Sequence, residues 1–468
     1  MAIILRQDGG GASHPSSSTT RAADSRHAIQ VIQRFARPLH GGPDDFAPLL
    51  ARIGEARIVM IGEASHGTHE FYRVRSEITK QLIATGKFGA VAVEADWPDA
   101  YRVNAFVQGI SAADHDATEA LDGFRRFPQW MWRNADVLDF VGWLRQHNDR
   151  VASTSRRVGF HGLDLYSLHA SMAAVVEYLH TVDPDAAQRA RARYSCFDHF
   201  GDEPQVYGHA TTLGIAASCE HEAIAQLLEM QRHATDRLRH DGAGDEAALF
   251  VAEQNARVVR NAERYYRAMF DRRAISWNLR DQHMMETLAM LDRFRSRHGE
   301  PHGIVVWAHN SHIGDARATD RAGIGELNIG QLARETFGTD VVLVGFSTYA
   351  GTVTAADDWG GPAARMVVRP ALPESVEWLL HETGLPSCYV DPSSNAELDA
   401  VLRSPRLARA IGVIYRPQTE RQSHYFSVSL AGQFDAVLHY DQTRAVEPLE
   451  RVGARNAGEL PETYPSAL

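Results

Sequence analysis

Short runs rich in Val and Ile recur along this chain and limit most strongly the fold that it can adopt. The five clearest runs lie at residues 57–62, 88–94, 156–164, 303–309 and 340–346. Continuous apolar runs of this length are typical of strands buried on both faces of a parallel sheet. Between the first two runs, Phe71, Val74, Ile78 and Leu82 recur at helical spacing, and Gly86 ends that segment. Because strand, helix and strand in succession form the α/β unit, the sequence predicts an α/β fold with a mainly parallel sheet flanked by helices.

A long stretch without strand candidates interrupts this pattern. Residues 168–300 carry helical apolar spacing, so we expect an all-helical lobe inserted into the α/β core, which occupies residues 26–167 and 301–468. Residues 1–25 are rich in Gly and Ser without periodic apolar positions, and we expect a disordered tail there. Three later strand candidates, whose order in the sheet the sequence leaves open, lie at residues 387–391, 410–415 and 434–440.

Composition narrows the kinds of partner that this chain can have. The formal net charge is -11, which argues against nucleic acid, because phosphate binding needs clustered Lys and Arg. No apolar run reaches the roughly 18 residues of a membrane-spanning helix, and the N-terminal apolar stretch is too short for a secretory signal. Cys196, Cys219 and Cys388 lie far apart with no CxxC pattern, which indicates neither a disulfide framework nor a thiolate zinc site. We therefore expect a cytoplasmic protein in a reducing compartment, with no membrane partner.

Polar residues follow four of the predicted strands, at the point where each strand ends. In chain order they are Glu63, His66, Glu94, Asp96, Asp164, His309, Asn310 and His312. Ligands of open α/β sheets bind beyond the carboxyl ends of the strands, so we expect these side chains to share one site. Each has a structural explanation of its own, since Glu63 can cap a helix and a lone buried His309 is usually a satisfied core residue. The argument therefore rests on their common location.

Arg75 supplies an independent argument. It lies on the face of the predicted helix that should pack against the sheet. A buried arginine needs an acidic partner, and Glu63 and Glu94 are the nearest candidates by topology. We expect a buried cluster of these three residues, with a purely architectural ion pair as the alternative.

Three segments together resemble the successive signatures of the erythromycin esterase family. They are GEASHGTHEFYRVR at 62–75, VAVEADWPDAYRVNAFV at 91–107 and WAHNSHIGD at 307–315. The resemblance extends from about Val59 to the segment 434–443. It implies an α/β core with a helical lobe and, for the resistance members of the family, hydrolysis of the macrolactone ester of 14-membered macrolides such as erythromycin. Many relatives are not known to act on macrolides, so the resemblance predicts the catalytic machinery better than the substrate.

The resemblance also implies roles for individual residues. His66 takes the general-base position of the family, Glu63 and Glu94 its motif carboxylates, Arg75 its arginine and His309 its second histidine.

The chemistry of ester hydrolysis suits the same residue types. The reaction needs a deprotonated attacking oxygen, and histidine is the natural base near neutral pH. We expect His66 to remove a proton from water while Glu63 or Glu94 accepts its other ring proton, as the acid does in a triad. Arg75 would hold those carboxylates, and His309 would bind the carbonyl oxygen or protonate the leaving group. The sequence thus predicts an esterase or lactonase that needs no cofactor and acts on a small-molecule ester or lactone, with macrolides as one candidate class.

Ser65 is the obvious rival nucleophile, and it would form an acyl-enzyme. The nucleophile elbow of α/β-hydrolases is G-x-S-x-G, and the segment from Gly62 to Gly67 places the serine at a different spacing. Ser65 or Thr68 is better suited to cap the following helix.

Two further alternatives remain open. His66, His69 and Glu70, or the His309 and His312 pair, could hold a metal ion in a metal-dependent hydrolase, although H-E-x-x-H is absent and Arg75 would repel a dication. A non-catalytic protein that binds a small molecule or a tetrapyrrole through histidine is the other alternative. We expect neither, because paired carboxylates with an arginine serve catalysis better than ligand gripping.

Several other side chains are expected to bind substrate in a cleft between the core and the helical lobe. A large amphipathic substrate needs broad apolar walls with few polar anchors. The candidates are Asp96, Trp132, Trp277, Arg280, His312 and Tyr349.

Overall fold

A sheet of nine strands forms the centre of the computed structural model, which describes residues 17–450 apart from 202, 241–245, 271–272 and 298–300. Strands β11, β6, β2, β5, β3 and β4 lie side by side in this order and run parallel. Strands β8, β1 and β7 add antiparallel pairs, while β9 and β10 form a separate small sheet. The predicted α/β fold with a mainly parallel sheet is therefore confirmed. The bounds are β1 (Arg37–Pro38), β2 (Ile58–Ile61), β3 (Phe88–Asp96), β4 (Gly159–Asp164), β5 (Gly303–Trp307), β6 (Val341–Ala355), β7 (Ala364–Val368), β8 (Ser387–Val390), β9 (Arg406–Arg409), β10 (Tyr425–Val428) and β11 (Ala436–Thr443).

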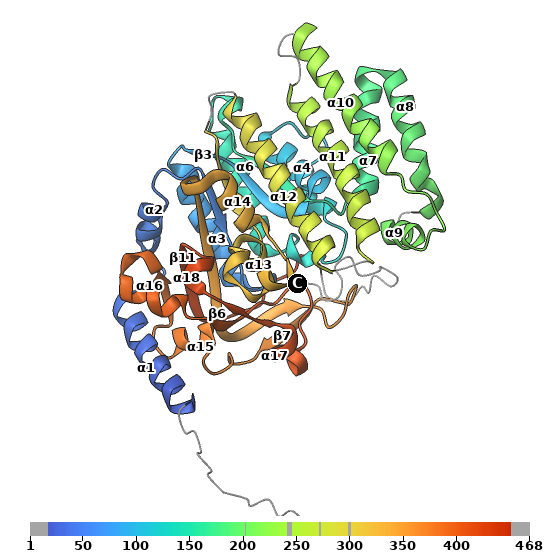
Figure 1. The fold of residues 1–468 in the computed structure, drawn as a ribbon. Helices are drawn as coiled ribbons and strands as arrows, with labels where there is room; N and C mark the ends of the chain where they lie inside the picture. The colour runs from blue at the N-terminus through green and yellow to red at the C-terminus, as the bar shows by residue number, and fades with distance from the viewer. Residues whose placement is uncertain (1–16, 202, 241–245, 271–272, 298–300, 451–468) are drawn as a thin grey trace, which may run out of the picture.

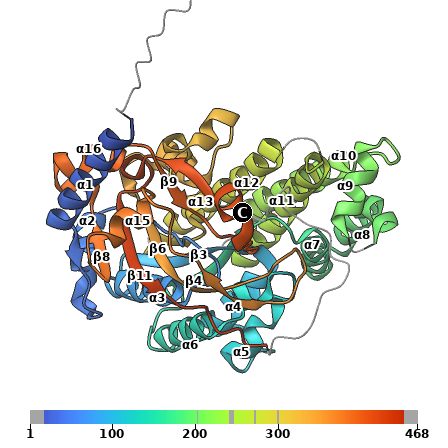
Figure 2. The same ribbon diagram turned by 90° about the horizontal axis from the view of Figure 1, so that it is seen from below.

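Helices cover both faces of this sheet (Figures 1 and 2). They are α1 (Ser17–Phe35), α2 (Ala47–Ile53), α3 (His69–Ala84), α4 (Trp97–Gln108), α5 (Ala117–Ala120), α6 (Ala135–Asp149), α7 (Leu168–Val182), α8 (Pro184–Tyr194), α9 (Pro204–Thr212), α10 (Glu220–His240), α11 (Glu246–Ala268), α12 (Arg273–Ser296), α13 (Asn310–Ile313), α14 (Ile329–Phe337), α15 (Val376–His381), α16 (Ala396–Arg403), α17 (Glu420–Ser423) and α18 (Leu430–Gln433).

The alternation of side chains along each strand divides the core into two layers. In β2, Val59 and Ile61 pack with the apolar face of α3, whereas Ile58 and Met60 pack with α12 and α1 on the other face. All four side chains are fully buried. A strand between two helical layers must be apolar at every position, which explains the continuous Val and Ile runs of the sequence.

The position of β5 decides which loops meet. Although β5 follows β3 by more than 200 residues in sequence, it lies between β2 and β3, and its Trp307 pairs with Ile61 of β2 and Val93 of β3. The loop that carries His309 therefore lies between the loop after β2 and the end of β3. Parallel strands in register deliver their carboxyl ends to one edge of the sheet.

Helices α7 to α11 share a hydrophobic core of their own, and Figure 1 shows them as a helical region beside the sheet. Helix α12 instead buries Met284, Leu288 and Leu291 against the sheet. Within the described residues, no helix has the combination of length and apolarity that crossing a bilayer requires.

Three details differ from the sequence-based expectations. Cys196 and Cys219 form a disulfide, because the turn through α9 brings positions 23 residues apart to a Cα separation of 6.1 Å. Residues 410–415 are not a strand and make only isolated bridges, from Ile411 to Ser65 and from Ile414 to Ala356. Helix α1 begins at Ser17, inside the expected disordered tail, while residues 1–16 lie outside the described residues.

Gly67 allows the loop after β2 to approach β6 closely. A Cβ at this position would lie 1.8 Å from the carbonyl oxygen of Thr354, whereas a Cβ at Gly142 in α6 would meet no atom within 4 Å. We expect Gly67→Ala to lower the free energy of unfolding by about 1–3 kcal/mol or more, as overpacking does. Gly142→Ala should raise it by about 0.5–1 kcal/mol, since alanine favours a helix. Urea unfolding of both variants measures the difference, and equal stabilities would contradict this packing.

Candidate active site

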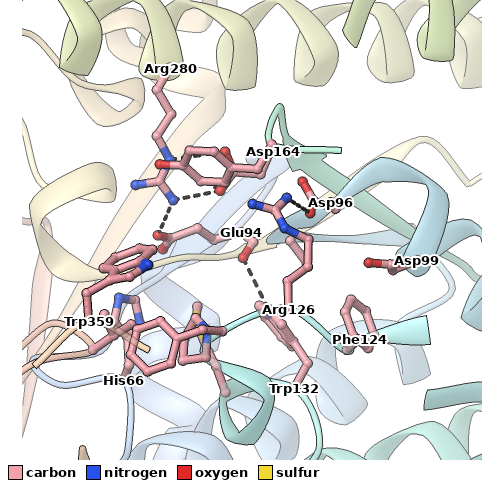
Figure 3. Close-up of a pocket in the computed structure, with 16 residues that line it drawn as sticks. His66, Glu94, Asp96, Asp99, Phe124, Arg126, Trp132, Asp164, Arg280 and Trp359 are labelled. Atoms are coloured by element: carbon pink, nitrogen blue, oxygen red, sulfur yellow. Dashed lines mark hydrogen bonds and ion pairs between the residues drawn. The ribbon is translucent and has the colours of Figure 1, made fainter. Parts of the chain in front are cut away.

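A cavity of about 710 Å³, counting space open to solvent, lies at the carboxyl ends of β2, β3 and β4 (Figure 3). Polar and aromatic side chains share its walls. They include His66, Glu94, Asp96, Asp99, Arg126, Asp164 and Arg280, with the rings of Phe124, Phe127, Trp132, Tyr166 and Trp359.

His66 is held by Glu63. Its Nδ1 lies 2.8 Å from Oε1 of Glu63, and both side chains are buried. The backbone is fixed as well, because His66 N–H donates to the carbonyl of Ile411, whose own N–H donates to Ala64. When Nδ1–H donates to Glu63, Nε2 is the basic nitrogen of the ring. Glu63, and not Glu94, is therefore the carboxylate that orients this histidine.

Arg75 lies beneath this pair and is fully buried. One of its guanidinium nitrogens, Nη2, lies 3.2 Å from Oε2 of Glu63. The guanidinium carbon lies 4.5 Å from the ring centre of Tyr72 and 4.8 Å from that of Trp307. The expected contact of arginine with Glu63 is present, while Glu94 is bound by a different arginine.

Glu94 joins the second half of the site. Its Oε2 accepts the backbone N–H of His309 at 2.8 Å, and its Oε1 accepts a hydrogen bond from Arg280 Nη2 at 2.8 Å. Burial alone would raise the pKa of Glu94, but the charges of His312 and Arg280 outweigh it and hold this pKa well below the usual range. Glu94 is thus a buried carboxylate that stays ionised at neutral pH.

His309 faces His66, with 4.8 Å between their ring centres. Burial and the neighbouring His66 hold the pKa of His309 well below its usual value, so the ring is neutral. Its Nδ1 accepts the backbone N–H of Ser311 at 3.2 Å, which leaves the ring proton on Nε2. Among the described residues, this buried Nε2 makes no hydrogen bond of ordinary geometry. It is therefore a donor without a strong acceptor, and the backbone carbonyl of Ala64 lies near this ring.

His312 lies behind Glu94 and does not line the cavity. Its Nδ1 lies 3.0 Å from each carboxylate oxygen of Asp281, and its Nε2 lies 3.0 Å from Arg280 Nη1 and 3.4 Å from Glu94 Oε1. Trp277 stacks on the ring with 4.5 Å between centres. Burial opposes protonation, but the charges of Asp281 and Glu94 prevail and raise the pKa of His312 to about 9.

Arg280 connects β3, β4 and α12. It donates to Asp164 through Nε at 3.0 Å and through Nη2 at 2.6 Å, in addition to its bond with Glu94. Asp96 pairs with Arg126 Nη1 at 2.9 Å on the same wall. Trp132 also lines the cavity, and its Nε1 donates to the Glu94 carbonyl at 3.2 Å.

The predicted residues thus fall into three groups. His66, Glu94, Asp96, Trp132 and Arg280 line the cavity. A second group, Glu63, Arg75, Trp277, His309 and His312, lies next to or behind these walls. Tyr349 stands apart from both, since it stacks on His381 with 3.6 Å between ring centres. The catalytic and binding roles of all these residues stay predictions.

Some wall residues were not predicted from the sequence. Asp99 and Arg126 are charged, and Trp359 arrives from the segment between β6 and β7. Only Asp99 carried a usable signal, because it is a carboxylate in the first turn of a helix that follows a strand.

The serine and metal alternatives can be compared with this geometry. Ser65 Oγ hydrogen-bonds Thr68 Oγ1. Thr68 stands at the N-cap of α3, but its side chain makes no capping bond there. In the part of the chain that the structure describes, no group of three or more His, Cys, Asp or Glu side chains is arranged to hold a metal ion.

The fold and the site place this protein among the α/β proteins whose site lies at the carboxyl ends of parallel strands. Comparisons with known proteins identify its family. The erythromycin esterase family model matches residues 83–443. This chain belongs to the erythromycin esterase family, as the sequence motifs predicted. The matched region begins after the segment that carries Glu63, His66 and Arg75.

Similar individual proteins are distant in sequence. Erythromycin esterase type II of Escherichia coli is 21% identical over 329 residues, which cover 67% of this chain and 74% of that protein. YbfO of Bacillus subtilis (strain 168) is 21% identical over 447 residues, covering 90% and 92%.

Solved structures share the fold. A structure titled as a succinoglycan biosynthesis protein superposes with a TM-score of 0.72 at 19% identity and covers 92% of this chain and 100% of its own. A histidine-to-asparagine mutant of erythromycin esterase EreC in its open conformation superposes with a TM-score of 0.64 at 16% identity, with coverage of 89% and 98%.

The raised pKa of His312 makes stability depend on pH. A histidine that titrates near 6.5 when unfolded and at about 9 when folded stabilises the protein fully below pH 6.5, and this stability is lost as the pH rises through about 9. Across this window we expect the free energy of unfolding to fall more steeply with pH in the wild type than in His312→Gln. The two slopes should differ by up to about 1.4 kcal/mol per pH unit. His27→Gln, an exposed control, should keep the wild-type slope. Denaturant unfolding at a series of pH values tests this, and parallel curves for the wild type and His312→Gln would contradict it.

Proposed function

We propose that this protein hydrolyses a carboxylic ester or lactone with water activated by His66, without a covalent intermediate. The observation that carries the proposal is a pair of facing histidines. His66 lines the cavity and is bound through Nδ1 to Glu63, and His309 lies directly behind it with 4.8 Å between the ring centres. One ring offers a basic nitrogen and the other offers an N–H donor. Ester hydrolysis needs both of these groups close to one carbonyl.

The roles follow from the hydrogen bonds. His66 Nε2 removes a proton from water, and Glu63 stabilises the imidazolium that forms. Arg75 compensates the buried negative charge of Glu63 and holds its carboxylate in place. His309 Nε2–H donates to the carbonyl oxygen as negative charge develops on it, or to the leaving alkoxide. Glu94 holds the backbone of the His309 loop through the N–H of His309.

The substrate class is the less specific part of the proposal. The cavity combines aromatic walls with a group of charged side chains, which suits an amphipathic ester that carries polar groups. A macrolide, and with it a role in antibiotic resistance, enters as a candidate through the name of the Escherichia coli relative. A hydrolysis screen of macrolides, simple esters and lactones, with mass detection of water addition, identifies the substrate.

Loss of either histidine should abolish hydrolysis. We expect His66→Ala and His309→Ala each to lower kcat/KM by at least about 10²-fold, which corresponds to about 2.7 kcal/mol of transition-state stabilisation. Steady-state kinetics on the substrate from the screen measures the effect, and circular dichroism checks the fold. His381→Ala is the matched control, because this histidine lies in a separate cluster with Tyr349 and Asp441.

Each outcome of this experiment is informative. Activity within a few fold of the wild type in His309→Ala would leave His66 and Glu63 acting alone. Binding of a small molecule by a protein that turns over no ester in the screen would favour the non-catalytic alternative.

A metal-dependent hydrolase using the same histidines is the second candidate, and chelation distinguishes it. We expect activity to survive exhaustive dialysis against a chelator, because the buried Arg75 adds positive charge beside the His66 and Glu63 pair. The measurement is kcat/KM before and after dialysis, with and without added zinc or manganese. Activity that is lost on dialysis and restored by either metal would establish the metal mechanism instead.

A further inference from the structure

Asp99 is a carboxylate of the cavity wall that the hydrolytic mechanism does not use. It lies in the first turn of α4, five residues after Glu94, and lines the same cavity as His66. Figure 3 shows Asp96 and Asp99 towards one side of the cavity and His66 towards the other. Across the described residues, the Asp99 side chain has no hydrogen bond and no ion pair, and it does not cap its own helix.

The arginines nearest to Asp99 are already engaged. Arg126 pairs with Asp96 at 2.9 Å. Arg102 donates to Asp114 through Nη2 at 2.6 Å and through Nε at 3.1 Å. The other carboxylates of the cavity, Glu94 and Asp164, share Arg280. Asp99 is therefore a carboxylate of this wall that has no arginine of its own and feels Arg126 and Arg102 only through their longer-range charges.

Asp96 supplies a second, independent observation. Its Oδ2 accepts the hydrogen bond from Arg126, and its Oδ1 is buried and makes no hydrogen bond of ordinary geometry within the described residues, although the backbone N–H of Tyr166 also stabilises the Asp96 carboxylate. A buried carboxylate oxygen without a donor is costly, and this cost is removed when a ligand supplies a positive charge. Burial and the charge of Asp96 raise the pKa of Asp99 to about 7, as expected for two carboxylates that share one arginine.

Aromatic rings complete this wall. Phe124 and Trp132 line the cavity with 6.1 Å between their ring centres. The residue before Phe124 is Gly123, where a Cβ would lie 3.2 Å from Asp99 Oδ1, so the glycine leaves the carboxylate uncovered. Carboxylates beside aromatic faces are the combination that binds alkylammonium groups, through charge and cation–π attraction together. A metal ion suits the wall less well, because the rings offer it no ligands and Arg126 adds a like charge.

We propose that Asp96, Asp99, Phe124 and Trp132 form a subsite for an alkylammonium group carried by the ester substrate. The inference rests on the proposed hydrolysis, since it places the cationic part of the substrate in the same cavity as the carbonyl that His66 attacks. The substrate is then a basic ester or lactone with a secondary, tertiary or quaternary amine. Its positive charge neutralises the carboxylate pair that the protein leaves incompletely paired.

A matched pair of esters isolates the charge. p-Nitrophenyl 4-(trimethylammonio)butyrate and p-nitrophenyl 5,5-dimethylhexanoate have the same shape and differ in the positive nitrogen. We expect kcat/KM of the wild type to be about tenfold higher for the cationic ester than for the neutral one, after correction for the spontaneous hydrolysis of each ester. The difference should come mainly from a lower KM. Asp99→Asn should bring the ratio close to one. Asp149→Asn removes the same charge from an exposed position on α6 and should keep the wild-type ratio.

Binding without turnover tests the subsite separately from the enzyme activity. Tetramethylammonium chloride, titrated against the full chain at constant ionic strength, should quench tryptophan fluorescence in the wild type and not in Asp99→Asn. The affinity for tetramethylammonium should rise between pH 6 and pH 8 as Asp99 ionises. The charged groups that act on Asp99 are Asp96, Arg126 and Arg102. Binding of tetramethylammonium without hydrolysis of either ester would support the subsite and refute the proposed function.

The opposite result is equally clear. Equal kcat/KM for the two esters together with no tetramethylammonium binding overturns the subsite and leaves the hydrolase intact.

Discussion

The buried carboxylate of Glu63 is the interaction on which the rest of the site depends. One oxygen receives His66 and the other faces Arg75, so a single side chain sets the ring orientation of the base and is itself held by a cation. This linked set of side chains is stable only when His66, Glu63 and Arg75 are all present, because a buried ion without its partner costs several kcal/mol. The aromatic rings of Tyr72 and Trp307 enclose the guanidinium and exclude water from it.

A second set of charges balances the other half of the site. Arg280 and the protonated His312 together face three carboxylates, Glu94, Asp164 and Asp281. This set joins β3, β4, α12 and α13, and it holds the loop of His309 through a backbone N–H. Helix α12, which packs against the sheet, therefore contributes Arg280 to the site at the strand ends.

Much of the site was predictable, and the misses have physical reasons. His66, Glu63 and Arg75 lie within 13 residues, where local spacing suffices to place them together. The sequence pairs Arg75 with both glutamates because β2 and β3 are consecutive strands of the same α/β unit, whereas in the sheet β5 lies between them. Tyr349 lies in the middle of β6 and stacks on His381, and nothing in one sequence tells which face of the sheet such a side chain will take. The disulfide was missed because its partners meet through the turn around α9.

The sequence determined the secondary structure and the chemistry of the strand ends, because both depend on local spacing: apolar runs make buried strands, and polar residues that follow them must lie at the sheet edge. Only the tertiary structure decided which of those ends are adjacent. The insertion of β5 between β2 and β3 places His309 beside His66 and assigns Glu94 to Arg280. The tertiary structure also decided that Asp99 has no arginine of its own, because Arg126 pairs with Asp96 and Arg102 pairs with Asp114. Strand order and ion pairing are set by long-range packing, in which residues far apart in the chain compete for the same neighbours.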